Sequence, residues 1–311
     1  MKNNYIKIIA LFVLVIGLVT GFTMSSLADD GGGASDSDNV NERIGSTIVT
    51  YGDALSEAQR EEVRALLRVD EASEVEEYDV TGEDIAYYID GNPNSNMYSS
   101  AKIVRQEEGN GLTINIITPS NITDVTKEMY ANAMLTAGVE NATVDVASPV
   151  QVTGSSALTG IYKAYDVEGE ELDKERMELA NDELDVATDL AEQEGMDQEK
   201  VSQLLTEIKQ MIAEMDPVSR EEVEQIVQEQ LDNLEINLSE EDRQRLIDLF
   251  DRMRDLNIDF DQVRNQLDDI ANTIMDRAEE LGLDEGFWQN VANFFSEMFQ
   301  AISNFFSGLF N

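Results

Sequence analysis

The sequence offers few residues that could carry out chemistry. It contains no His and no Cys, which excludes a Ser-His-Asp triad, a thiolate nucleophile and a zinc site built on these ligands. One Ser-x-x-Lys pattern, Ser99 to Lys102, matches the nucleophile and base of penicillin-recognising enzymes. The pattern lies in a strand-like stretch and lacks the Ser-Asp-Asn and Lys-Thr-Gly partners of that chemistry, so we interpret it as a chance match.

A stretch of small residues, Gly154 to Gly160, precedes a predicted helix. Backbone N–H groups at a helix start can bind an anion. The Lys that ends a phosphate-binding loop is missing here, however. We therefore expect these residues to let the helix approach a sheet closely.

Acidic residues dominate the charge, because 64 Asp and Glu oppose 21 Lys and Arg for a formal charge of −43. This balance excludes binding to nucleic acid through charge. No pattern places a carboxyl in the apolar cleft that a glycosidase acid requires. We predict only diffuse binding of divalent cations, with no defined metal site and no cofactor. Neighbouring carboxylates on predicted solvent faces occur at Glu170-Glu171, Glu221-Glu222, Asp268-Asp269 and Glu279-Glu280.

The N-terminus has the pattern of a secretory signal peptide over residues 1–28. Two Lys residues precede an apolar run from Ile8 to Phe22, and Ser26-Leu27-Ala28 supplies small residues for cleavage after Ala28. The run is short for a membrane span of about 20 residues, and an uncleaved anchor is the alternative. Residues 29–46 are acidic and rich in Gly and Ser, which predicts a flexible tether. We expect a secreted protein that is released or held at the cell surface.

Residues 47–168 alternate between strand and helix signals, which predicts an α+β domain with helices on one face of a sheet. Capping patterns at Ser56 and Thr81 predict helix starts. Residues 126–137 are predicted to form a further helix, which Gly138 ends. The turn 107–111 predicts a hairpin between the two strands that flank it. Strands are predicted at residues 47–51, 74–80, 99–105, 112–118 and 142–146.

Residues 169–286 carry apolar residues at helical spacing, which predicts helical hairpins or a bundle. Ser239, followed by Asp242 three residues later, starts one of these helices. The four apolar stripes cover residues 201–215, 223–234, 246–253 and 263–274.

The last segment, residues 287–311, predicts a Phe-rich amphipathic helix that holds seven of the chain's 11 Phe residues. Three interpretations are open: docking on its own domain, lying in a membrane interface, or self-association and capture by a partner protein. The absence of Lys and Arg from its polar side weakens the membrane interpretation. The residues that would make the contact are Phe287, Trp288, Val291, Phe294, Phe295, Met298, Phe299, Ile302, Phe305, Phe306 and Phe310.

Three stretches of this sequence together resemble a known family. They are residues 50–60 (TYGDALSEAQR), residues 125–133 (VTKEMYANA) followed by Thr136-Ala137-Gly138-Val139, and residues 152–164 (VTGSSALTGIYKA). The sequence is similar over residues 47–215 to the YpuA-like family of extracellular proteins from Gram-positive bacteria, a domain of unknown function. The resemblance implies an exported protein with an α+β N-terminal part and a helical C-terminal part, and it supplies no catalytic residues.

These patterns favour a non-enzymatic exported protein that acts at the cell exterior through its C-terminal helix. The alternative is an extracellular hydrolase of wall polymer or peptide that uses carboxylates or the Ser99 and Lys102 pair. The hydrolase hypothesis predicts a deep cleft in which those groups converge.

Overall fold

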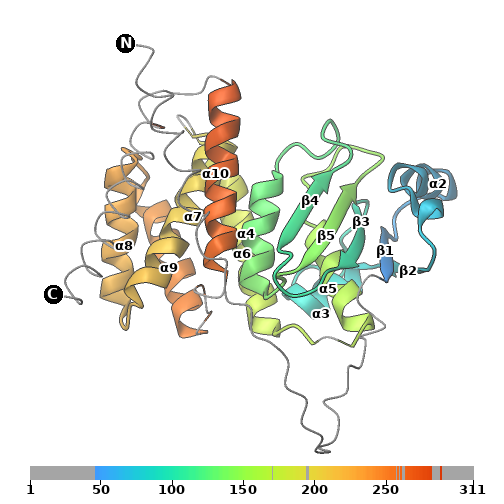
Figure 1. The fold of residues 1–311 in the computed structure, drawn as a ribbon, viewed down its shortest axis with the longest axis horizontal. Coiled ribbons are helices and arrows are strands. Elements are labelled where there is room, and N and C mark those ends of the chain that lie inside the picture. Colours follow the sequence, from blue (N-terminus) through green and yellow to red (C-terminus); the bar gives the residue numbers. More distant parts are fainter. Residues whose placement is uncertain are drawn as a thin grey trace, which may run out of the picture. The chain divides into compact units, whose positions relative to one another are not determined.

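The computed structural model describes residues 46–281, apart from residues 170, 194–195, 257, 259 and 261–262, together with Trp288. The α+β class is confirmed, because a mixed sheet is followed by a series of helices (Figure 1). The strands are β1 (Thr47–Gly52), β2 (Val75–Val80), β3 (Ser100–Arg105), β4 (Leu112–Ile116) and β5 (Ala142–Ala147). The helices are α2 (Glu57–Leu66), the 3-10 turn η1 (Val69–Glu71), α3 (Gly82–Ile89), α4 (Lys127–Ala137), α5 (Ala157–Val167), α6 (Lys174–Ala191), α7 (Gln198–Met215), α8 (Arg220–Asn233), α9 (Glu240–Asp255) and α10 (Arg264–Leu281).

The strands of the described region form one mixed sheet in the order β2-β1-β3-β5-β4. β1 runs parallel to β2 and antiparallel to β3. β5 runs antiparallel to β3 and parallel to β4. β2 and β4 are therefore the two edge strands of this sheet.

The predicted hairpin between β3 and β4 is wrong. Only residues 106–111 separate the two strands in sequence, yet β5 lies between them and pairs with both. The connecting loop crosses the start of β5, where the Asn141 side-chain oxygen accepts hydrogen bonds from the N–H groups of Gly109 at 2.9 Å and Gly111 at 3.0 Å. Asn141 thus supplies acceptors for loop amides, which lets the chain bridge two strand positions without a tight turn.

Each face of the sheet carries its own helices. Strand residues alternate between the faces, so that Ile48 joins the apolar cluster under α3, α4 and α5, whereas Val49 and Tyr51 pack with Val63 of α2 on the opposite face. The predicted packing of helices on one face is thus correct for α3, α4 and α5, and α2 with η1 covers part of the other face.

Two glycines allow α5 and its leading loop to lie close to neighbouring elements. A Cβ atom at Gly160 would lie 2.5 Å from the Thr50 hydroxyl oxygen in β1. Gly154 has a φ of 104°, and a Cβ atom there would lie 2.8 Å from the Tyr130 hydroxyl, which itself donates to the Gly154 carbonyl oxygen at 2.6 Å. The close approach of helix to sheet that we expected from the small residues is present.

Capping chemistry explains where several helices begin and end. Ser56 and Thr81 each form a reciprocal capping box with the residue three positions later. The Thr126 hydroxyl accepts from the Met129 N–H at the start of α4, and Gly138 ends that helix in the left-handed region with a φ of 90°. These signals are local in sequence, and all four predictions are confirmed.

Helix α7 is surrounded by other helices. It packs against α4, α6, α8 and α10, and every residue from Val201 to Gln210 is buried. Because α4 also packs on α6, one apolar cluster continues from the sheet into α9 and α10. The four predicted stripes correspond to α7, α8, α9 and α10, whereas α6 has no predicted stripe. No helix within the described ranges has the length and apolar content to span a bilayer.

Candidate functional site

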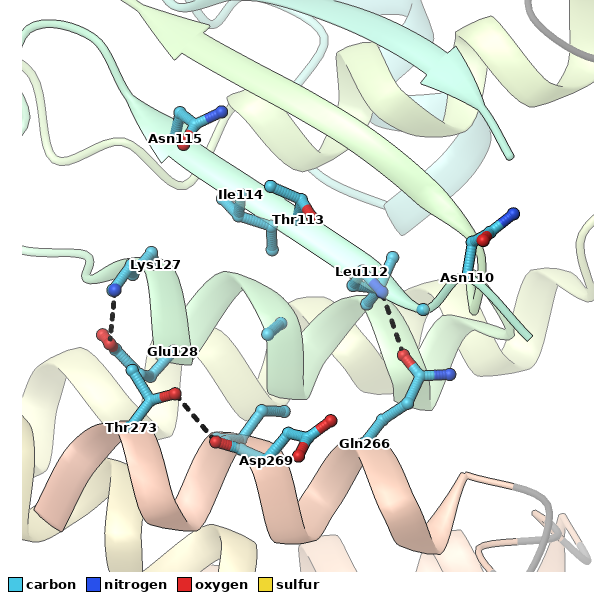
Figure 2. Close-up of a pocket in the computed structure, with 13 residues that line it drawn as sticks. Asn110, Leu112, Thr113, Ile114, Asn115, Lys127, Glu128, Gln266, Asp269 and Thr273 are labelled. Atoms are coloured by element: carbon cyan, nitrogen blue, oxygen red, sulfur yellow. Dashed lines mark hydrogen bonds and ion pairs between the residues drawn. The ribbon is translucent and has the colours of Figure 1, made fainter. Parts of the chain in front are cut away.

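A pocket of about 330 Å³ lies along the free edge of β4, between that strand, α4 and α10 (Figure 2). Strand, helix and loop side chains of mixed polarity form its wall. The lining residues are Asn110, Gly111, Leu112, Thr113, Ile114, Asn115, Lys127, Glu128, Ala131, Gln266, Asp269, Ile270 and Thr273.

The backbone of β4 presents hydrogen-bonding groups to this pocket. Hydrogen bonds from Ala142 N–H to Gly111 O and from Ile117 N–H to Val146 O show that the odd-numbered residues of this stretch bond to β5. In a parallel ladder the intervening residues then direct their N–H and C=O groups to the other edge. The Leu112 N–H donates at 3.1 Å to the side-chain oxygen of Gln266 in α10, across one end of the pocket (Figure 2).

Glu128 places a carboxylate in the wall of the pocket although it is only 5% exposed. Its Oε1 atom accepts no hydrogen bond from any residue that the structure describes, and the Lys127 amine lies 3.6 Å away. Its Oε2 atom lies 3.5 Å from the Arg277 guanidinium. Arg277 also contacts Glu199 of α7 at 3.1 Å, so two carboxylates share one guanidinium at this end of the pocket.

A second pocket, of about 430 Å³, continues along β4 in the direction of Pro119. Both pockets are lined by Ile114, Asn115 and Lys127. Gln198 and Arg277 close the second pocket on the helical side. We call the two pockets together the β4 groove.

A buried ion pair lies deeper in the helical part, between α6 and α7. The Lys209 amine donates to Glu183 Oε1 at 2.5 Å and to the Asn132 main-chain oxygen at 2.8 Å. Glu183 Oε2 accepts from the Thr136 hydroxyl at 2.5 Å. Burial lowers the pKa of Lys209, and the Glu183 carboxylate opposes that shift.

The hydrogen bonds around this pair extend along α4 and α7. The Asn132 amide donates at 2.9 Å to the Thr206 hydroxyl, which donates at 2.7 Å to the Ser202 main-chain oxygen. Lys209 is 0% exposed and Glu183 is 1% exposed, so neither side chain can reach a substrate. The network fastens α4, α6 and α7 to one another, and we assign it a structural role.

Sequence reasoning missed this network, although one signal for it was present. The sequence of α4 carries apolar or small residues on every side, and the helix is buried all round between Glu128 and Ala137. A helix of that kind must give its polar residues internal partners. Asn132 and Thr136 lie one turn apart on α4 and were therefore candidates for such contacts. Their partners on α6 and α7 are distant in sequence and left no local signal.

Glu207 is a second buried carboxyl on α7. It accepts from the Gln203 amide at 2.9 Å, and its Oε2 atom has no hydrogen-bond partner among the described residues. Burial raises the pKa of Glu207 to about 8, against a smaller lowering by the Gln203 hydrogen bond. The raised pKa of Glu207 favours its protonated form at neutral pH.

The Ser99 and Lys102 pattern does not assemble a nucleophile and base. Ser99 is 2% exposed and directly precedes β3, and residues three apart along an extended chain face opposite sides. The Lys102 amine bonds to the Leu67 main-chain oxygen at 2.7 Å and to Asp145 Oδ2 at 2.7 Å. The Asp145 carboxylate also accepts from the Asn115 amide at 2.8 Å. Lys102 thus belongs to a row of cross-strand contacts on the sheet face opposite α4.

Neighbouring carboxylates behave mainly as the predicted solvent-facing groups. Glu171, Glu221, Glu222 and Asp269 are exposed. Asp268 differs, because it is half-buried and accepts from the Gln210 amide at 2.7 Å, and burial raises its pKa. Within the described part of the chain, no three acidic side chains converge closely enough to hold a metal ion. Glu170 lies outside the described residues.

The predicted contact residues of the Phe-rich segment lie outside the described residues, with one exception. Trp288 is half-buried and packs against the main apolar cluster. The signal peptide and the acidic tether also lie outside the described residues.

Comparison with known proteins gives the chain a family. A family described as "Protein of unknown function (DUF1002)" matches residues 51–270. The chain is 33% identical over 273 residues to "Uncharacterized protein YpuA" of Bacillus subtilis (strain 168), an alignment that covers 85% of this chain and 90% of that protein. No solved structure matches the chain. The resemblance seen in the three stretches of sequence is therefore confirmed, and the chain belongs to this YpuA-like family of unknown function.

Proposed function

We propose that this protein is an exported, non-enzymatic binding protein that acts at the cell exterior through the apolar face of its Phe-rich C-terminal segment. The position of Trp288 is the observation that carries this proposal. Trp288 is the second aromatic residue of the segment, and it packs against the main apolar cluster. We infer that a partner protein or a second copy of the chain binds the Phe residues that follow Trp288 in the sequence.

The charge and the chemistry of the segment support a protein partner over a lipid surface. Its polar residues are Asn, Gln, Ser and Glu, whereas helices that lie on anionic membranes carry Lys and Arg on that side. The alternative hydrolase function has no geometric support from Ser99 and Lys102, since they face opposite sides of the extended chain.

Sedimentation analysis of the full chain tests this proposal. A variant with Phe305, Phe306 and Phe310 changed to Ser keeps Trp288 and removes apolar surface near the end of the segment. We expect the wild-type chain to self-associate or to retain a partner, and the variant to sediment as a monomer. A matched control changes Ser303 and Ser307, on the polar side, to Ala.

Flotation with vesicles of phosphatidylcholine and phosphatidylglycerol separates the remaining interpretations. If the wild type binds vesicles and the Phe variant does not, the segment binds a membrane and the proposed protein partner is contradicted. Identical sedimentation and flotation of the wild type and both variants would contradict any association through this segment. Docking of the segment on its own domain would then be the remaining interpretation.

A further inference from the structure

We propose that the β4 groove binds an extended peptide that pairs with the free edge of β4 and inserts a Lys or Arg side chain beside Glu128. This surface is formed by β4, α4, α7 and α10, and it is separate from the Phe-rich segment. The proposal therefore stands or falls independently of the function proposed above.

The backbone of the strand supplies the first argument. In the described sheet no strand pairs with the outer edge of β4, and the ladder with β5 directs the N–H and C=O groups of Ile114 to that edge. The side-chain oxygen of Gln266 already accepts a hydrogen bond from the Leu112 N–H, in the way that a peptide carbonyl would. A strand of five residues extends about 17 Å, which fits a peptide of four to six residues.

The buried carboxylate supplies the second argument. Glu128 is 95% buried and lines the pocket, yet its Oε1 atom accepts no hydrogen bond from the described residues. The two cations near it, Lys127 and Arg277, stand at 3.6 and 3.5 Å and are themselves partly exposed. An ammonium or guanidinium group of a peptide could approach the Oε1 atom to hydrogen-bond distance and would then bind this carboxylate more strongly than Lys127 or Arg277 does.

The net charge of the molecule favours a basic peptide, although the wall of the groove holds the cations Lys127 and Arg277 beside its carboxylates. Asp269 of α10 adds a further carboxylate to the wall of the groove (Figure 2), and the whole chain carries a formal charge of −43. The long-range field attracts basic partners to every face of the molecule. At the β4 groove the described residues combine that field with a buried carboxylate and a free strand edge.

Fluorescence anisotropy with a labelled pentapeptide, acetyl-Thr-Val-Lys-Val-Thr-amide, tests the side-chain contact on the full chain. We expect saturable binding, and at least tenfold weaker binding of the peptide with Glu in place of Lys. Glu128→Gln should weaken binding of the Lys peptide about tenfold, because a hydrogen bond to a charged group is lost. Glu62→Gln, an equal charge change at an exposed position of α2, should have no effect. Equal weakening by both variants would show diffuse attraction and overturn the proposal.

Peptide N-methylation tests the strand contact without changing the protein. Methyl groups on alternate amides block one edge of an extended peptide and leave the other edge free. One peptide is methylated on the amides of its second and fourth residues, and another on the amide of its third residue. We expect one of these two peptides to lose binding and the other to keep it. Loss of binding with both patterns, or with neither, would contradict pairing with the edge of β4.

Discussion

Lys209 and Glu183 form an ion pair in the interior of the protein, with Lys209 Nζ 2.5 Å from Glu183 Oε1 and both side chains at most 1% exposed. The pair joins α7 to α6, and the bond from Lys209 to the Asn132 main-chain oxygen adds α4. Because desolvation offsets most of the attraction, such a pair stabilises little by itself, whereas one partner alone leaves an uncompensated buried charge. An alignment of these three helices that separated the two side chains would leave a buried charge uncompensated.

The first prediction separates these two effects. Lys209→Met should lower the free energy of unfolding by about 3–5 kcal/mol, because Glu183 is left buried without its cation. The double variant with Glu183→Leu should recover most of that loss, since it removes both charges. Urea unfolding followed by circular dichroism measures both changes.

An exposed lysine provides the control for this experiment. Lys174 is 53% exposed and pairs with Glu178 on the surface of α6, so Lys174→Met should change stability by less than about 1 kcal/mol. Similar losses at both lysines, or no recovery in the double variant, would contradict the assigned role of the buried pair.

Glu207 should make the protein less stable as the pH rises. Its pKa is about 8 in the folded protein and 4.5 in the reference state, so the folded chain binds more protons than the unfolded chain between these values. The stabilisation is fully present below pH 4.5 and is lost as the pH rises to about 8, with a limiting slope of about 1.4 kcal/mol per pH unit.

Glu207→Gln should remove this contribution, because an amide of the same shape does not ionise. We expect the variant to gain stability relative to the wild type between pH 5 and pH 8, as measured by urea unfolding at both values. Glu62→Gln, at an exposed site, should leave the difference between the two pH values unchanged. Parallel pH profiles for wild type and Glu207→Gln would show that Glu207 ionises freely in the folded protein.

Much of the local structure could be predicted because its causes are local. The capping boxes at Ser56 and Thr81 and the left-handed Gly138 depend on residues within a turn of each other. The hairpin between β3 and β4 failed for the opposite reason. The path of the chain between β3 and β4 depends on Asn141, which is 30 residues from Gly111. It also depends on β5, which follows β4 in the sequence and lies between β3 and β4 in the sheet.

The sites were harder to predict than the elements. Periodicity finds one apolar stripe on α7, yet Gln203, Thr206 and Lys209 are buried on its other sides, because four helices surround it. The apolar stripe of α6 is interrupted by Glu183, whose burial becomes acceptable only with Lys209 in place. Glu128 lies in the first turn of a helix, where acidic side chains are common. The sequence therefore gives no sign that this residue is buried in the wall of a groove.

The close contact between Gly160 and Thr50 gives a third prediction. Gly160→Ala places a Cβ atom 2.5 Å from the Thr50 hydroxyl oxygen, so either α5 or the Thr50 side chain must shift, at a cost of about 1–3 kcal/mol. Thr50→Ala removes that oxygen, and the double variant should therefore lose less stability than the sum of the two single variants. Urea unfolding of all four proteins gives the coupling energy. Additive losses would mean that α5 accommodates the methyl group without touching Thr50.

Salt should stabilise this protein strongly, because it carries a formal charge of −43. Repulsion among the acidic groups opposes the compact state, and the Debye length falls from about 30 Å at 0.01 M to about 3 Å at 1 M ionic strength. We expect NaCl over this range to raise the Tm by about 5 °C or more, since each kcal/mol corresponds to about 2–4 °C for a domain of this size. Such a dependence would suit a protein that works in a saline exterior.

Two variants show whether net charge causes the effect of salt. Changing the exposed residues Glu61, Glu62 and Glu229 to Gln should raise the Tm at low salt and flatten its salt dependence, because less repulsion is left to screen. The double variant of Lys209→Met and Glu183→Leu keeps the net charge and changes only buried groups, so its salt dependence should match that of the wild type. A Tm that does not change with NaCl in the wild type would show that the acidic surface does not limit the stability of the fold.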